Sequence, residues 1–213
     1  MAADWEGEHW HHKYAPKSGT SRDGMPLSIN RAPAEDLQPW GARLVAAQIE
    51  AVPGSLIRCG MCTDLAYARI ILRGDWAATS ADGTQHYRDE ALLFGPHSRY
   101  MPLSCSGPVM AIGVGLRPGA LPLLTGRATD ELVNRIERTD PLHLVEHDLF
   151  AEYSPSDDPE QWLERIEEML RRRIAELAPA HPDRISTAFE LAGFSDPNLV
   201  LSDVAELQGI SLR

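Results

Sequence analysis

The deciding segment for the fold is Ala66-Tyr67-Ala68-Arg69-Ile70-Ile71-Leu72-Arg73. Along it, Ala66, Ala68, Ile70 and Leu72 alternate with Tyr67, Arg69, Ile71 and Arg73. A period of two places successive side chains on opposite faces of a β-strand. Gly74-Asp75 then interrupts the pattern, and Asp82-Gly83 is typical of a hairpin turn. The segment therefore predicts a strand that leads into a β-hairpin.

Further short strands surround this segment. They are predicted at residues 43–50, 76–79, 91–94, 98–104 and 109–116. Six or seven short strands about ten residues apart, with no helix between them, indicate an antiparallel barrel or sandwich.

The pattern becomes helical after residue 117. Short helices are expected at 121–124 and 128–138, and another at 182–192. The longest begins at Asp158-Pro159, where Asp158 caps the helix and proline occupies its first position. Its apolar residues follow an i, i+3, i+7 stripe, made by Leu163, Ile166, Leu170, Ile174 and Leu177. Strands first and helices second predict an α+β chain.

The composition limits the class of protein. The 213 residues carry a formal net charge of −11, whereas a DNA-binding surface is expected to be basic. This acidic balance fits a regulatory or enzymatic domain, or a DNA-binding protein that has lost its basic end. We expect no membrane span and no secretory signal, and the three cysteines favour a reducing cytoplasm over a disulfide framework.

Residues 199–213 have the pattern of the first half of a helix-turn-helix. Ser202 is a good N-cap, Ala205 lets a second helix cross closely, and Gly209 supplies the turn. Ser211 would cap the recognition helix, of which the sequence holds only the start, up to Arg213. An ordinary αα-corner has similar spacing and remains an alternative.

Catalytic and metal-binding patterns find little support. His86 and His97 flank a predicted strand, but the His-x-His pair of a metal-dependent cupin enzyme is absent, so we expect no metal, no cofactor and no enzyme. Cys59-Gly-Met-Cys62 has the spacing of a redox or zinc half-site. Small buried thiols are the simpler interpretation.

Two segments resemble the AraC family of transcriptional regulators. They are residues 93–99, Leu-Phe-Gly-Pro-His-Ser-Arg, and residues 113–120, Gly-Val-Gly-Leu-Arg-Pro-Gly-Ala. The resemblance covers roughly residues 32–213. It implies a cupin-like barrel or half-barrel that senses an effector or mediates dimerisation, followed by DNA-binding units. A small metal-dependent cupin-fold enzyme is the alternative.

This resemblance suggests four parts. We expect a flexible arm at 1–34, a cupin-like β regulatory domain at 35–118, a helical linker and dimerisation region at 119–195, and a helix-turn-helix start at 196–213. Because the recognition helix is incomplete, we expect DNA to be a partner only of a longer, full-length protein.

The expected effector site lies on the strands. Its candidate residues are Tyr67, Arg69, Trp76, Arg99 and Tyr100. Arg69, in an apolar strand, is a possible carboxylate clamp, unless it points outward to solvent. The helix at 159–178 is the candidate homodimer element, unless its apolar stripe packs on the β domain.

Overall fold

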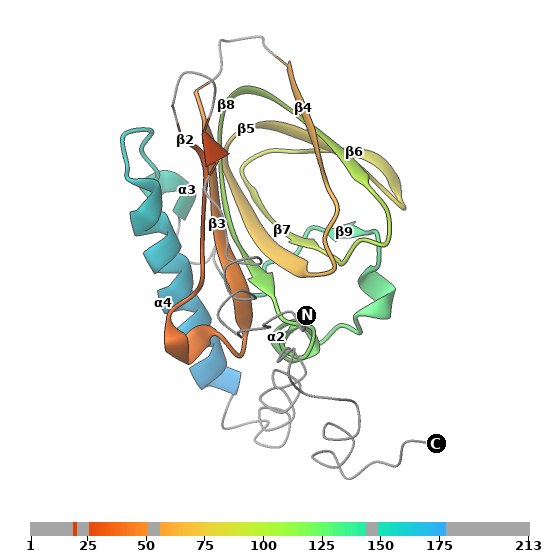
Figure 1. Ribbon diagram of the computed structural model, residues 1–213, viewed down its shortest axis with the longest axis vertical. Helices are drawn as coiled ribbons and strands as arrows, with labels where there is room; N and C mark the ends of the chain where they lie inside the picture. The colour runs from red at the N-terminus through yellow and green to blue at the C-terminus, as the bar shows by residue number, and fades with distance from the viewer. Residues whose placement is uncertain (1–18, 21–25, 51–55, 144–148, 178–213) are drawn as a thin grey trace, which may run out of the picture.

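The computed structural model describes residues 19–20, 26–50, 56–143 and 149–177 (Figure 1). The strands are β1 (Gly19–Thr20), β2 (Pro26–Arg31), β3 (Gly41–Ile49), β4 (Leu56–Met61), β5 (Ala66–Ser80), β6 (Gly83–Tyr87), β7 (Glu90–Phe94), β8 (Met101–Leu116) and β9 (Ile136–Glu137). The helices are η1 (Glu35–Leu37), α2 (Ala120–Thr125), η2 (Asp130–Leu132), α3 (Leu149–Glu152) and α4 (Pro159–Leu177). The α+β class is confirmed.

The strands form one open antiparallel sheet. Their order is β1-β2-β3-β8-β5-β7-β9, with β4 paired to β8 and β6 paired to β5. Within the described residues the end strands β1 and β9 do not pair with each other, so no barrel is closed. Of the barrel and the half-barrel that the sequence left open, the closed barrel is therefore wrong, because the sheet ends in two short edge strands.

Two long strands, β5 and β8, bend the sheet. Each joins two strands that the sequence predicts separately. The ladder between them shifts register between Ile71 and Asp75, and Gly74 and Gly107 adopt positive φ angles of 96° and 74°. A register shift of this kind is a β-bulge, in which an extra residue in one strand kinks that strand without ending it. The first half of β5 pairs with β7, and its second half pairs with β6.

The bend gives the sheet an outer and an inner face, each with its own apolar cluster. Ala66, Ala68, Ile70 and Leu72 of β5 lie in the outer cluster with the helices. The inner cluster contains Tyr67, Ile71, Trp76, Ala78, Tyr87, Leu92, Phe94, Met101, Leu103, Cys105, Val109, Ala111 and Ile136. The alternation in residues 66–72 thus predicted the two faces of β5 correctly.

Helix α4 covers the outer face along β3, on the opposite side of the molecule from β4 and β6 (Figure 1). As predicted, Asp158 caps the helix, since its Oδ1 accepts from the Glu160 amide at 3.0 Å. Leu163, Ile166 and Leu170 of the apolar stripe are buried in the outer cluster. The stripe therefore packs on the chain's own sheet, and a homodimer remains a prediction without an assigned surface.

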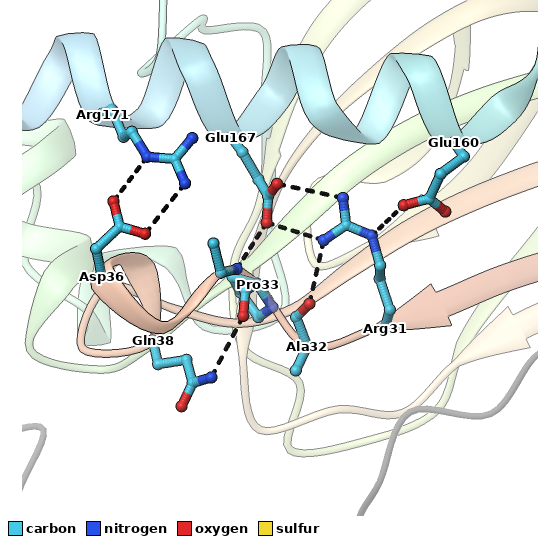
Figure 2. Close-up of polar contacts among 9 residues, drawn as sticks. Arg31, Ala32, Pro33, Asp36, Gln38, Glu160, Glu167 and Arg171 are labelled. Atoms are coloured by element: carbon cyan, nitrogen blue, oxygen red, sulfur yellow. Dashed lines mark hydrogen bonds and ion pairs between the residues drawn. The ribbon is translucent and has the colours of Figure 1, made fainter.

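A polar network ties α4 to the segment after β2 (Figure 2). Buried Glu167 accepts from Arg31 Nη1 at 2.8 Å and from the Ala34 amide at 2.7 Å. Glu160 also pairs with Arg31, and Arg171 holds Asp36 through Nε at 2.6 Å. The network holds the segment from Arg31 to Asp36 against α4.

Two predicted segments differ in the structure. Residues 128–138, expected as a helix, form η2 and β9, because β9 completes the edge of β7 by pairing Ile136 with Phe94. Residues 26–31, placed in the flexible arm, form β2 and pair with β3. The predicted helix at 182–192 lies outside the described residues. Among the described helices, none has the length and apolar character needed to span a membrane.

Candidate ligand site on the inner face

Arg69 lies on the inner face of β5, buried at 9% exposure. The ladder places it opposite Leu92 of β7 and Gly113 of β8. Of the two orientations left open by the sequence, the structure has the inward one. A positive charge therefore sits inside an otherwise apolar cluster.

Three aromatic rings surround this charge. The guanidinium carbon lies 5.6 Å from the ring centre of Tyr67, 5.8 Å from that of Trp76 and 5.4 Å from that of Phe94. Cation–π contacts of this kind offset part of the desolvation of a cation. The guanidinium carbon of Arg43, on β3, also lies 5.8 Å from the ring centre of Tyr67, so two cations contact this one ring.

No carboxylate among the described residues pairs with Arg69, whose one hydrogen bond there is from Nη1 to Met61 Sδ at 3.6 Å. A guanidinium has five N–H donors, and thioether sulfur is a weak acceptor. Burial lowers the pKa of Arg69, which reflects the cost of holding this charge away from water. An unpaired buried charge is expensive, so this position favours an anionic partner, which the described residues do not supply.

Glycines of β8 make the space for these side chains. A Cβ at Gly113 would lie 2.7 Å from the Ala68 carbonyl oxygen and 3.3 Å from Arg69 Cβ. A Cβ at Gly115 would lie 3.1 Å from the Tyr67 ring. Both glycines belong to the segment that resembles AraC regulators, and here their physical role is to clear the inner face beside Arg69.

The same face holds further buried polar groups without a hydrogen-bond partner in the described part of the chain. They are Trp76 Nε1, Tyr87 Oη and both ring nitrogens of His97. Burial lowers the pKa of His97, and the nearby charge of Arg69 lowers it further, so the imidazole is held neutral. Neutral imidazole offers one donor and one acceptor. These groups suit a ligand that carries polar atoms besides its anion.

The loop that positions His97 depends on a close backbone approach. A Cβ on Gly95 would lie 1.8 Å from the Leu132 carbonyl oxygen, so only glycine fits. The Gly95 amide donates to Arg135 O at 3.0 Å, and the Asn134 amide donates to Pro96 O at 2.9 Å. The first AraC-like segment, which contains Gly95, Pro96 and His97, therefore holds His97 near Arg69.

Three of the five predicted ligand residues come together here, namely Tyr67, Arg69 and Trp76. Arg99 and Tyr100 are exposed instead, Tyr100 at 61%. Tyr100 lines a separate hollow of about 320 Å³ that also contains Thr79 and Thr84. The segment 98–100 precedes β8 rather than belonging to it, which explains the difference.

Sequence reasoning missed Phe94, Tyr87 and Arg43 as members of this site. Phe94 is opposite Tyr67 on β7, and Tyr87 is opposite Trp76 on β6. Only strand register brings these residues to one face. The hairpin turn at Asp82-Gly83 was the one sequence signal that places Tyr87 near Trp76.

The metal candidates do not form a centre in the described part of the chain. His86 is exposed on β6, whereas His97 is buried. No group of three or more histidine, cysteine or acidic side chains there is able to hold a metal ion. The predicted DNA-binding residues Ser202, Ala205, Gly209, Ser211 and Arg213 lie outside the described residues.

The fold and the site together define an α+β domain with a buried arginine on the inner face of an open sheet, and no described carboxylate pairs with it. Residues 31–138 match the family model described as a domain of unknown function, DUF6597. The chain belongs to this family. A search of curated proteins gave no match.

Solved structures show weak likeness to the chain. A protein of unknown function (DUF1255) from Acinetobacter sp. ADP1 is 18% identical, with a TM-score of 0.33, over 47% of this chain and 89% of its own. Apo ToxT from Vibrio cholerae is 8% identical, with a TM-score of 0.34, over 79% of this chain and 71% of its own. The AraC-like transcriptional activator CuxR is 12% identical, with a TM-score of 0.32, over 87% of this chain and 77% of its own. With TM-scores this low, none of the three defines what this chain does.

Proposed function

We propose that this chain is the effector-sensing region of an AraC-type transcriptional regulator, and that its effector is an organic carboxylate bound at Arg69. In this proposal the β region has no catalytic role. DNA contact belongs to the segment that begins near residue 196, and dimerisation uses a surface other than the apolar stripe of α4.

One observation supports the proposal most directly, the buried guanidinium of Arg69 without a carboxylate partner in the described part of the chain. A planar guanidinium matches a carboxylate through two parallel hydrogen bonds. The rings of Tyr67, Trp76 and Phe94 provide apolar walls on which the carbon skeleton of a ligand packs. The two segments that resemble AraC regulators, 93–99 and 113–120, both contribute residues to this site. That shared location supports a regulatory role for the site.

Ligand-dependent thermal unfolding tests the clamp. Acetate, benzoate and decanoate are compared with acetamide, benzamide and decanamide, which keep the shape and lose the charge. We expect at least one carboxylate to raise the Tm with concentration while its amide does not. A ligand at a hundred times its Kd stabilises the folded state by about 2.7 kcal/mol.

Arg69→Met is the matched variant. Methionine fills a similar volume without a charge, so we expect the variant to fold at least as stably as the parent protein. It should lose the response to the carboxylate completely. An equal response in Arg69→Met, or no response of the parent protein to any of the three carboxylates, would reject the clamp.

A further inference from the structure

Two cysteines from neighbouring strands meet on the inner face. Cys59 of β4 is opposite Leu103, and Cys105 of β8 is opposite Ile57. Residues that are directly opposite share a face, and Leu103 and Cys105 both belong to the inner cluster. Cys59 and Cys105 are therefore diagonal neighbours on that face.

Their exposure differs in a useful way. Cys59 is exposed, whereas Cys105 is buried. A reagent from solvent therefore reaches Cys59 first, and Cys105 stands behind it as the second thiol. Cys62, three residues further along the chain, is exposed as well but lies beyond the end of β4.

Both cysteines adjoin the Arg69 site. Met61, which contacts Arg69 Nη1 at 3.6 Å, lies two residues from Cys59 and therefore on the same face of β4. Cys105 is directly opposite Trp76, whose ring packs against the guanidinium. A thiolate at Cys59 is thus within the field of an unpaired buried cation.

The electrostatics agree with this geometry. The neighbouring Cys105 thiol lowers the pKa of Cys59, burial opposes it, and the charge of Arg69 lowers it further, giving a value of about 7. The neighbouring Cys59 thiol, together with burial, raises the pKa of Cys105. Cys59 is therefore the thiol that ionises near neutral pH, and thiolate is the reactive form of cysteine.

We propose that Cys59 and Cys105 form a reversible disulfide, with a hydroperoxide as the oxidant. The Cys59 thiolate attacks one peroxide oxygen, so that an S–O bond forms, the O–O bond breaks, and hydroxide leaves and takes up a proton. Cys105 sulfur then attacks Cys59 sulfur. The S–S bond forms, the S–O bond breaks, and the departing hydroxide takes the Cys105 proton as water. Two thiols are oxidised, and one hydrogen peroxide is reduced to two waters.

The position of β4 makes closure of this bond feasible. Diagonal neighbours in a sheet have Cα atoms about 7–8 Å apart, whereas a disulfide requires less than about 6.8 Å. One strand must therefore move by about 1 Å. Within the described residues β4 pairs only with β8, so it is an edge strand that is free to make this shift.

This inference is independent of the proposed carboxylate ligand. It requires only that Cys59, Cys105 and Arg69 lie together on the inner face. Oxidation would also consume the Cys59 thiolate, which is a negative charge close to Arg69. The redox state would therefore change the net charge of the site.

The test begins with the full chain, fully reduced and treated with hydrogen peroxide, then alkylated with iodoacetamide and mapped by mass spectrometry. We expect a Cys59–Cys105 disulfide that dithiothreitol reverses, with Cys62 remaining alkylated. A Cys59–Cys62 disulfide, or peroxide treatment that leaves all three thiols free, would overturn the proposal.

Alkylation rates of the unoxidised protein provide the second readout. Cys59 should react at least several-fold faster than Cys62 at pH 7, with a pH profile centred near 7, and Arg69→Met should slow Cys59 but not Cys62. Cys62→Ser is the matched control and should still form the disulfide. Equal rates at Cys59 and Cys62 would contradict the proposal, and this readout does not depend on whether a Cys105 variant folds.

Discussion

At the scale of single residues, Gly113 determines whether Arg69 fits on the inner face. We predict that Gly113→Ala destabilises the protein by about 1–3 kcal/mol, since the new Cβ would lie 2.7 Å from the Ala68 carbonyl oxygen and the backbone of two central strands must separate. The change should also weaken carboxylate binding, because Arg69 moves with its strand. Urea unfolding measures the first effect, and ligand-dependent Tm shifts measure the second.

Gly60→Ala is the control for this prediction. Gly60 is also a strand glycine, but the three atoms nearest to its Cβ would all belong to the exposed ring of Tyr100, which is free to swing into solvent. We expect a cost below about 1 kcal/mol and no effect on ligand binding. If both alanine variants lost the same stability, crowding beside Arg69 would not be the cause.

The sequence identified Arg69, Tyr67 and Trp76 but not the other residues of the site. An arginine in an apolar strand is visible in the sequence, and the period of two places Tyr67 on its face. Whether that face is inner or outer depends on which face of the sheet the helices cover. Helix α4, which covers the opposite face, begins about ninety residues after Arg69 in the chain. Phe94 and Tyr87 reach the site through strand register, which no local pattern specifies.

At the scale of elements, Glu167 joins α4 to the segment after β2 (Figure 2). We predict that Glu167→Gln lowers the free energy of unfolding by about 2–3 kcal/mol, because it removes a buried charge that accepts from Arg31 and from the Ala34 amide. The expected loss of stability is smaller than for breaking a fully buried ion pair, because Arg31 still pairs with Glu160. Urea unfolding of both proteins at neutral pH gives the difference.

Glu168→Gln is the matched control on the same helix. Its side chain is 70% exposed and lies 3.8 Å from Arg172, so we expect a change of at most about 0.5 kcal/mol. An effect of Glu168→Gln as large as that of Glu167→Gln would show that general charge on the helix, rather than the contact with Arg31, is responsible.

The contribution of Glu167 should depend on pH with a defined sign. Burial acts to raise the pKa of Glu167, but the hydrogen bonds from Arg31 and Ala34 outweigh it and leave the pKa below its ordinary value of 4.5. A carboxyl with a lowered pKa in the folded state stabilises the protein above its unfolded pKa. The difference between parent and Glu167→Gln should therefore be constant near neutral pH and shrink as the pH falls below about 4.5. A difference that grows toward acid pH would contradict this sign.

Most elements were predictable where local chemistry is strong. The Asp158 cap, the α4 stripe and the turn at Gly83 require only neighbouring residues, and each is present. The long strands were predicted in pieces because Gly74 interrupts the sequence pattern, although a positive φ lets the strand continue through a bulge. Residues 136–137 form a strand only because the edge of β7 is available to them.

At the scale of the whole molecule, the bent sheet has two halves that differ in how they are covered. The half built from β3, the start of β5 and the end of β8 lies between the helices on one face and the inner cluster on the other. The half built from β4, β6 and the remaining parts of β5 and β8 has fewer buried residues, and most of β4 and β6 is exposed. Local opening is easier where fewer apolar contacts are lost.

Hydrogen exchange should separate these halves. We predict that backbone amides of β4 and β6 exchange well before those of residues 66–71 and 111–116, measured by mass spectrometry under native conditions, because the central strands open only with global unfolding. Easier opening of β4 is also what the Cys59–Cys105 disulfide requires, since β4 must move toward β8. Oxidised protein should therefore show slower exchange in β4 with no change in residues 111–116. If β4 were as protected as the central strands in reduced protein, the sheet would behave as one rigid unit, and the edge-strand movement would have no basis.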